Sequence, residues 1–565
     1  SEFDSNYIFK SEQDHTYKYY SGAALYITGN DDKVYNSTFN NSGIKNGEIG
    51  FINGGTIYIL GNNTIISGCD ISNTAANQGG SIYISGNNAT IIKTGFSNSQ
   101  ADDDGGALFV TGEDCKLYNS TFIDNIAGDD GGAINWEGND GLIYNITCIN
   151  NRGISSTGSS NGGTICLTGN NTNVTKSNFT MTSAKIAGGA IFVTGNEVTI
   201  SDSSFAFCSV AHDVASTGKN YKNGGGSIYV LGNYSHIINC SFEKSNGRQG
   251  GVMYIQGHDV TVKDIKADFS YASKEGGAIF VEGANATISG SSFTRGNSTS
   301  ASGGSIYVKG DNADIVNSNF TMSMSANQGG AIFVDGYNAT ISGGTCRMNN
   351  ATNDGGCIFI KGDDTKILGV TFMQSHADKT GGMITVDGRN VYINGSSFSM
   401  SSSNYGGAIY IGGTAAGSGY NATIENSKFD KNNATKDGGA IYIKGDLADV
   451  LDCEFSLATA YTGNGGGIYV GGNNATVGGA VSVMSRAVNG DGGFAYIKGN
   501  DVLVIDSRVM QSGAKNGGAV YFRCHEQSGS YVNKTWVPKI KYYSANITNC
   551  AFSKNTADRG GAIYG

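Results

Sequence analysis

The sequence predicts an all-β fold, a right-handed parallel β-helix of about twenty rungs, with three short strands and about 26 residues per rung. A motif of the form Gly-Gly-small-Ile-aromatic-Ile/Val recurs along the 565 residues, and fourteen of the nineteen intervals between its copies are 25–27 residues long. The chain also has a single proline. Proline has no backbone N–H, so its rarity suits a fold in which the backbone N–H groups donate hydrogen bonds between neighbouring strands. The right hand follows from the general rule for parallel crossovers.

One repeat, Gly276–Gly303, shows how the rung is built. Side chains alternate between the two faces of a strand, so Ile279 and Val281 of the motif point inward. A glycine then suits a sharp bend, and a second short strand brings Ile288 inward. A third brings Phe293 inward, and a phenylalanine recurs at this offset in most repeats. The polar stretch that leads to the next Gly-Gly is predicted to be a turn.

The aromatic residue of the motif has the opposite parity and is predicted to point outward. It recurs from Tyr26 to Tyr564 and is interrupted by Asn135, Cys166 and Thr385. Two interpretations are open. The rings form an exposed stripe for sugars, a partner or another copy, or they pack on one another beneath loops. Burial of the rings in a single chain would exclude the first interpretation.

Composition limits the function classes. The net charge is −10 and only 15% of residues are charged, which argues against a nucleic-acid partner. The sequence has no apolar run of 18 residues, so no membrane span is expected. We expect an N-terminal cap at residues 1–21 and one elongated coil over 22–565. Because the chain stops within a motif, a C-terminal cap or anchor is expected to lie outside it.

Five of the eleven cysteines are predicted to be small buried side chains and not halves of disulfides. Cys69, Cys240 and Cys453 share one offset of the repeat, and Cys148 and Cys346 replace the recurring phenylalanine. There is no C-x-x-C motif, so a zinc site is not expected. Free thiols on a surface protein would suit an anoxic habitat, which is a hypothesis.

Sequons of the form Asn-x-Ser/Thr are frequent, and each has two interpretations. In an exported chain they are glycan acceptors on an exposed surface; alternatively, turn asparagines stack into amide ladders. The glycosylation candidates are Asn36, Asn88, Asn119, Asn145, Asn285, Asn338, Asn421 and Asn546.

The repeat resembles a known family. GGAINWEGNDG at Gly131–Gly141 and NNATKDGGAIYIKG at Asn432–Gly445 are similar to adhesin-like surface proteins of methanogenic archaea. A weaker resemblance, to chlamydial polymorphic membrane proteins, rests on F-x-x-N at Phe122–Asn125, Phe429–Asn432 and Phe552–Asn555. The resemblance implies an extracellular location at the cell surface and attachment to glycans or proteins of other cells.

The best candidate for a metal site is acidic. Asp103 and Asp104 stand one period before Asp129 and Asp130, so the repeat places these carboxylates about 5 Å apart on adjacent rungs. Calcium is the cation that such a cluster fits. The alternative is a solvated polar turn. No cofactor is otherwise expected, and no catalytic residues are assigned.

Recognition is expected where the period breaks. Insertions are predicted at Ile149–Gly162, Cys208–Gly224, Gly412–Tyr420 and Cys524–Ala545, with a smaller one near Asn46–Asn53. The insertion at Cys524–Ala545 is aromatic and locally basic, which is typical of an interface; the alternative is a flap over the last rungs. Its binding candidates are Tyr531, Trp536, Lys539, Lys541, Tyr542 and Tyr543.

The sequence therefore favours a non-catalytic extracellular adhesin or adhesin-like stalk. A structural coat or filament subunit that self-associates through the faces of the coil is the first alternative. A polysaccharide lyase or hydrolase on a β-helix is the second, and it would need a converging acidic cleft.

Overall fold

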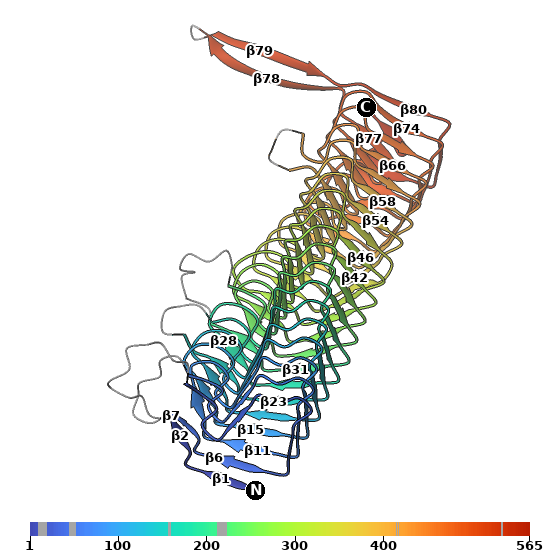
Figure 1. The fold of residues 1–565 in the computed structure, drawn as a ribbon. Helices are drawn as coiled ribbons and strands as arrows, with labels where there is room; N and C mark the ends of the chain where they lie inside the picture. The colour runs from blue at the N-terminus through green and yellow to red at the C-terminus, as the bar shows by residue number, and fades with distance from the viewer. Residues whose placement is uncertain are drawn as a thin grey trace. The chain divides into compact units, whose positions relative to one another are not determined.

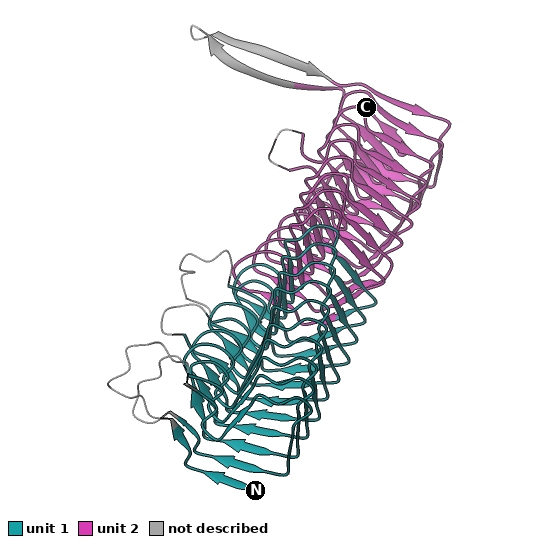
Figure 2. Cartoon of the chain, in the orientation of Figure 1, with its two compact units in different colours: residues 1–292 teal, residues 293–565 magenta. Residues whose placement is uncertain are grey.

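The protein was analysed as a computed structural model that describes residues 1–8, 20–44, 52–155, 160–211, 223–413, 415, 417–532 and 535–565. Contacts divide the chain into two compact units, Ser1–Ser292 and Phe293–Gly565 (Figure 2). Apart from one antiparallel hairpin near the C-terminus, the described elements of each unit are short β-strands that pair in parallel from rung to rung (Figure 1). The predicted parallel β-helix is confirmed. Among the described residues there is no helix that could cross a membrane.

A rung contains four strands, one more than predicted. In one rung they are β13 (Ile82–Ile84), β14 (Thr90–Ile92), β15 (Gly95–Ser97) and β16 (Gln100–Ala101). The fourth strand lies in the stretch predicted to be a turn; it is only two residues long, too short to show an alternating pattern. Ile82 pairs with Leu108 of the next rung, a shift of one period.

The first strands of the rungs carry the Gly-Gly motif and number ten in each unit. Unit 1 has β4 (Leu25–Ile27), β9 (Ile57–Ile59), β13, β17 (Leu108–Val110), β21 (Ile134–Trp136), β25 (Ile165–Leu167), β29 (Ile191–Val193), β33 (Ile228–Val230), β37 (Met253–Ile255) and β41 (Ile279–Val281). Unit 2 has β45 (Ile306–Val308), β49 (Ile332–Val334), β53 (Ile358–Ile360), β57 (Ile384–Val386), β61 (Ile409–Ile411), β65 (Ile441–Ile443), β69 (Ile468–Val470), β73 (Ala495–Ile497), β77 (Val520–Phe522) and β83 (Ile563–Tyr564).

Residues in the left-handed backbone region form the corners between strands. In the rung that starts with β13 they are Asn88, Lys93, Asn98 and Gly105, with φ of 54°, 50°, 52° and 63°. Asparagine, aspartate and glycine adopt this region at the lowest cost, which explains why they recur at the corners. The first glycine of the motif is required sterically, because a Cβ on Gly188 would lie 2.2 Å from the carbonyl oxygen of Ile191.

The recurring phenylalanines form the predicted internal ladder. Phe372, Phe398 and Phe429 stack with ring centroids 4.8 Å apart at each step and are buried. Burial of each ring contributes about 1.5–3 kcal/mol to stability. The ladder therefore joins neighbouring rungs from inside, in addition to the backbone hydrogen bonds.

The N-terminal residues begin the coil directly. β1 (Glu2–Asp4) pairs in parallel with β6 (Thr38–Asn40). Residues 9–19 lie outside the described residues, so the cap predicted at residues 1–21 stays a prediction. β2 (Tyr7–Ile8) likewise pairs with β7 (Gly43–Ile44). Residues 1–8 thus add strands to the sheets of unit 1.

The insertions leave each unit at one edge. In unit 1 they follow a fourth strand and precede a first strand, as between β24 (Arg152–Gly153) and β25, and between β32 (Ser209–Val210) and β33. In unit 2 they follow a first strand, as between β61 and β62 (Thr423–Glu425), and between β77 and β80 (Ala545–Thr548). Both edges border the sheet of first strands.

Candidate functional site

The acidic cluster lies in unit 1, immediately before β17 and β21. Oxygens of Asp103, Asp104 and Asp129 all lie within 4.8 Å of one another. The backbone N–H of Asp130 donates to Asp104 Oδ1 at 2.9 Å, and that of Asp129 donates to the carbonyl oxygen of Asp103 at 2.8 Å. The predicted adjacency of these residues across two rungs is therefore present.

Burial and mutual repulsion disfavour negative charge in this cluster. Burial, together with repulsion from the carboxylates of Asp103, Asp130 and Asp129, raises the pKa of Asp104 to about 7, although the hydrogen bond from the Asp130 N–H lowers it. Burial also raises the pKa of Glu137, which follows β21. A cation or a proton would relieve this repulsion.

The outward aromatic residues of the first strands, here called the aromatic ladder, are mostly covered. Tyr229 and Tyr254 stack at 4.6 Å and are fully buried, whereas Tyr26 in the first rung is 55% exposed. This burial excludes an exposed binding stripe for most rungs and supports the second interpretation, in which the rings pack on one another beneath the chain. The outward parity is as predicted, but most of the rings are covered by a turn of the chain.

The residues two positions before the second glycine, here called the covering row, explain this burial. A Cβ on Gly224 would lie 2.5 Å from Cδ2 of Tyr254 in the next rung. In unit 2 the ring of Tyr405 lies edge-on to Tyr442 of the next rung, with centroids 5.5 Å apart. Asp104 and Asp130 belong to this row, so the acidic cluster covers part of the aromatic ladder.

The acidic cluster coincides with an interruption of the aromatic ladder. Phe109 is followed by Asn135 and then by Cys166, which pair with each other in register on β21 and β25. Cys166 is buried, and its pKa is raised well above its ordinary value, first by burial and then by the carboxylates of Asp130 and Asp104. Small polar residues thus replace rings beside the acids.

The second interruption, in unit 2, has its polar group satisfied. Thr385 replaces the ring in β57, and its hydroxyl lies 3.1 Å from that of Thr380 in the covering row and donates to the Thr380 carbonyl oxygen. Thr380 in turn donates to Asp354 at 2.8 Å. Burial, followed by repulsion from Asp354, raises the pKa of nearby Asp387 to about 6.

The F-x-x-N asparagine has a structural role. Asn432 is buried, and its Nδ2 donates to the carbonyl oxygen of Phe398 in the preceding rung at 3.1 Å. Its Oδ1 accepts from the hydroxyl of Ser401 at 2.6 Å. Asn125 likewise donates to the carbonyl oxygen of Phe96 at 3.3 Å. The motif therefore links successive rungs within the core.

Comparison with known proteins agrees with this motif. Two segments match the Chlamydia polymorphic membrane protein repeat. They are residues 426–444 and 549–565, and they contain Phe429–Asn432 and Phe552–Asn555. The weaker resemblance is thus found in these two segments, while similarity to archaeal adhesin-like proteins stays a prediction.

The other comparisons add little. A search of curated proteins found no match. Among solved structures, a complex of the alginate lyase AlyF-OU02 with G6 is 10% identical, with 87% of this chain and 90% of that chain covered. Its TM-score is 0.27, too low to support an argument about function.

The predicted binding segment near the C-terminus forms a hairpin. β78 (His525–Val532) and β79 (Thr535–Tyr542) pair antiparallel, with Gly529 opposite Pro538, so the single proline lies outside the rungs as predicted. The Tyr543 hydroxyl donates to Glu526 Oε2 at 2.7 Å. The side chains of the other candidates lie outside the described residues; these are Tyr531, Trp536, Lys539, Lys541 and Tyr542.

The glycosylation candidates combine both interpretations. All eight asparagines are exposed, and several of those at the corners also form amide ladders. Asn145 Nδ2 donates to Asn119 Oδ1 at 2.7 Å, and Asn421 Nδ2 donates to Asn390 Oδ1 at 3.0 Å. In these pairs the side-chain nitrogen of the donor, which would carry a glycan, is engaged in a hydrogen bond, and the glycosylation sites stay predictions.

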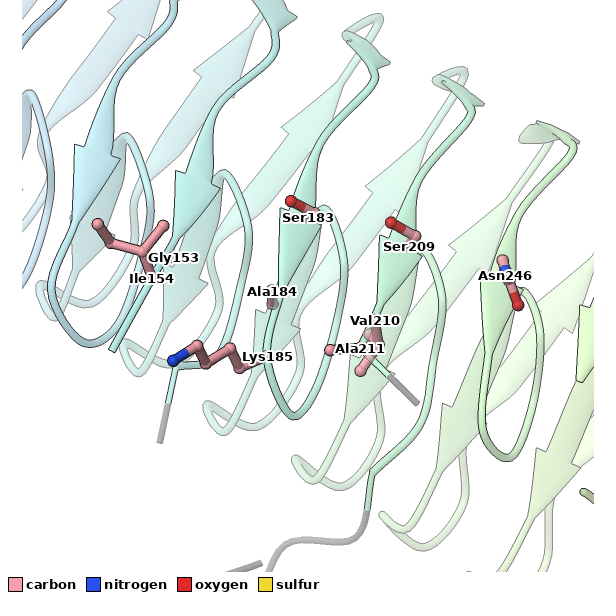
Figure 3. A pocket seen from close by; sticks show the side chains of 9 residues that line it. All are labelled: Gly153, Ile154, Ser183, Ala184, Lys185, Ser209, Val210, Ala211 and Asn246. Atoms are coloured by element: carbon pink, nitrogen blue, oxygen red, sulfur yellow. The ribbon is translucent and has the colours of Figure 1, made fainter. Parts of the chain in front are cut away.

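A shallow pocket of about 430 Å³ lies on the fourth strands of unit 1 (Figure 3). Ser183, Ser209 and Asn246 line it from successive rungs, and Ile154 and Lys185 lie at its side near the predicted insertions. The amine of Lys185 donates to the carbonyl oxygen of Ser155. The pocket offers hydroxyls and an amide, which could hold a polar ligand.

A serine–histidine–aspartate chain was not predicted from the sequence, although Asp378 follows His376 in the same rung and Ser402 stands one period after His376. His376 Nδ1 lies 2.7 Å from Ser402 Oγ, and His376 Nε2 lies 3.0 Å from Asp378 Oδ1. The side chains of His376 and Asp378 are 46% and 60% exposed. Nucleophilic catalysis needs a preorganised, water-excluding site, so this exposed arrangement is weak support for it.

The cysteines are unpaired, and nine of the eleven are buried. Cys524 is exposed and Cys550 is partly exposed. Burial raises the pKa of Cys240 and Cys453 to about 12, which keeps both thiols protonated. The predicted burial is therefore confirmed for all five cysteines for which it was made, Cys69, Cys148, Cys240, Cys346 and Cys453.

Proposed function

We propose that this chain is an extracellular β-helical adhesin, displayed at a cell surface, that attaches to glycans or proteins of other cells. The observation that carries the proposal is the match of residues 426–444 and 549–565 to a repeat of chlamydial polymorphic membrane proteins. The proposal includes no catalytic step and no nucleic-acid partner.

The insertions are the proposed contact regions. A uniform coil presents similar side chains at every rung, so discrimination between ligands must come from residues that break the period. The hairpin β78–β79 extends an edge of unit 2 between β77 and β80. Its sequence holds Tyr531 and Trp536, residue types enriched at binding hot spots.

Cell attachment by the purified chain tests the proposal. Beads coated with the chain are incubated with candidate host and microbial cells, untreated or pretreated with protease or periodate, which separates protein from glycan receptors. A short variant replaces residues 528–539 with Asn-Gly, a favoured two-residue hairpin turn. Tyr234→Ala, at an exposed corner of a regular rung, is the control.

We expect the short variant to lose at least tenfold in bound cells while its melting temperature and that of the control stay unchanged. No attachment to any cell type would contradict the adhesin. Concentration-dependent growth of ordered particles in light scattering would support the coat subunit instead, and release of oligosaccharides from acidic polysaccharides would support the enzyme.

A further inference from the structure

We propose that unit 1 binds a calcium ion where its aromatic ladder is interrupted, with oxygen ligands from Asp103, Asp104, Asp129 and Asn135. The site would consist of two adjacent turns before β17 and β21 and the outward side chain of β21. It lies within one unit and uses only regular rungs.

Asn135 supplies the observation that points to a ligand. Its side chain is 3% exposed, and its Oδ1 has no hydrogen-bond partner among the described residues. A buried carbonyl oxygen without a partner destabilises the folded state, so such atoms normally find a donor or a cation. This atom belongs to the first side chain after Phe109 in the interrupted ladder.

The backbone of Asn135 lies beside the acids. A Cβ on Gly105 or Gly131 would lie 3.2 Å or 3.1 Å from the backbone nitrogen of Asn135, and these glycines directly follow Asp104 and Asp130. In unit 2 the residue at the position of Asn135 contacts the covering row of the preceding rung, as Tyr442 contacts Tyr405. The equivalent neighbour of Asn135 in the preceding rung is Asp104.

The chemistry of these groups selects a hard cation. Ionised carboxylates and an amide oxygen are all acceptors, so they cannot satisfy one another. Calcium binds such oxygens at about 2.3–2.6 Å, which sets opposite ligands about 4.6–5.2 Å apart. Oxygens of Asp103, Asp104 and Asp129 lie within 4.8 Å of one another, close enough for one ion to contact all three. Magnesium binds at shorter distances and needs a more regular octahedron.

The second interruption provides an internal comparison. Thr385 is satisfied by Thr380, and the positions equivalent to Asp103 and Asp129 are Asn353 and Lys379. A lysine in place of a ligand carboxylate would repel a cation. The four-oxygen arrangement of unit 1 is therefore a property of its own sequence and not of every interruption.

Calcium titration of the full chain tests the site. After EDTA treatment and buffer exchange to pH 7.5, isothermal calorimetry measures calcium binding, and terbium luminescence sensitised by buried Trp136 in β21 reports its location. We expect one site with a dissociation constant on the order of 10⁻⁴ M. Asp103→Asn should weaken binding at least tenfold, whereas Asp102→Asn, an exposed neighbour outside the cluster, should change it less than twofold.

A third variant, Asn135→Thr, copies the residue of the second interruption and should weaken binding at least fivefold. Absence of saturable binding up to 10 mM calcium would overturn the proposal. A protonated Asp104 carboxyl group would then be the donor that satisfies Asn135 Oδ1. Equal affinities of the Asp103→Asn and Asp102→Asn variants would also overturn it, because the ion would then bind elsewhere. Both results leave the adhesin proposal intact, since that proposal is tested by cell attachment.

Discussion

Asn432→Ala should destabilise the rungs around β64 (Asn433–Ala434) more than any surface change nearby. The substitution removes the bond from Nδ2 to the Phe398 carbonyl oxygen and the bonds from the Ser401 hydroxyl and N–H to Oδ1, at 3.1, 2.6 and 3.4 Å. Each contributes about 0.5–1.5 kcal/mol, so the loss is about 3 kcal/mol, and the partners left behind are buried.

Hydrogen exchange followed by mass spectrometry measures this loss locally, which suits a solenoid whose rungs open in groups. A loss of about 3 kcal/mol corresponds to about 100-fold faster exchange, since about 1.4 kcal/mol is a factor of ten. The faster exchange should appear in β59 (Ser397–Ser399), β60 (Ser402–Ser403) and β64.

Asn433→Ala is the matched control, because Asn433 is the adjacent residue and only half-buried. It should change exchange less than threefold. If Asn432→Ala accelerated exchange no more than this control, the buried asparagine would not link the rungs, and the physical explanation of the F-x-x-N motif would be refuted.

Three further outcomes are expected. Phe269→Asn should raise the free energy of unfolding by about 0.5–1 kcal/mol, measured by thermal denaturation. Phe269 is 45% exposed at a left-handed corner with φ of 53°, a backbone conformation that asparagine tolerates better than phenylalanine. A loss of stability would contradict this explanation. In EDTA, Asp104 has a pKa near 7 in the folded state and keeps a proton that the unfolded chain releases near pH 4, so the free energy of unfolding should fall as the pH rises from 4 to 7. Asp104→Asn should flatten this pH dependence in urea titrations. An unchanged slope would exclude Asp104 as its source. In thiol titration of the native chain, Cys524 should react first and the buried cysteines only on unfolding, and fast reaction of all eleven would contradict their burial.

The sequence predicted the coil because its period and its inward positions are fixed by geometry. Residues such as Ile82 and Phe96 repeat at the offsets that alternation requires, and both are buried. The sequence left two interpretations of the aromatic ladder open, because alternation says which face a side chain occupies but not what lies over that face. The covering contact, as between Tyr405 and Tyr442, joins residues that are far apart in the sequence.

The acidic cluster could be found from the period alone, since Asp103 and Asp129 are one repeat apart. The role of Asn135 could not, because its importance depends on an unpartnered atom beneath a neighbouring turn. The exposed corner residues Met181 and Phe207, with φ of 55° and 57°, are likewise invisible to pattern analysis, since neither residue type favours that conformation.

The four left-handed corners have a consequence for how such a chain can change over generations. Each rung ends in the same backbone geometry with which it began, so an in-frame duplication or loss of one repeat would leave every junction chemically equivalent. Length can then drift by whole rungs at little risk to folding. Extra residues enter only at the edges bordering the first strands, as between β24 and β25 or between β77 and β80, so new recognition segments would arise beside a scaffold that stays constant.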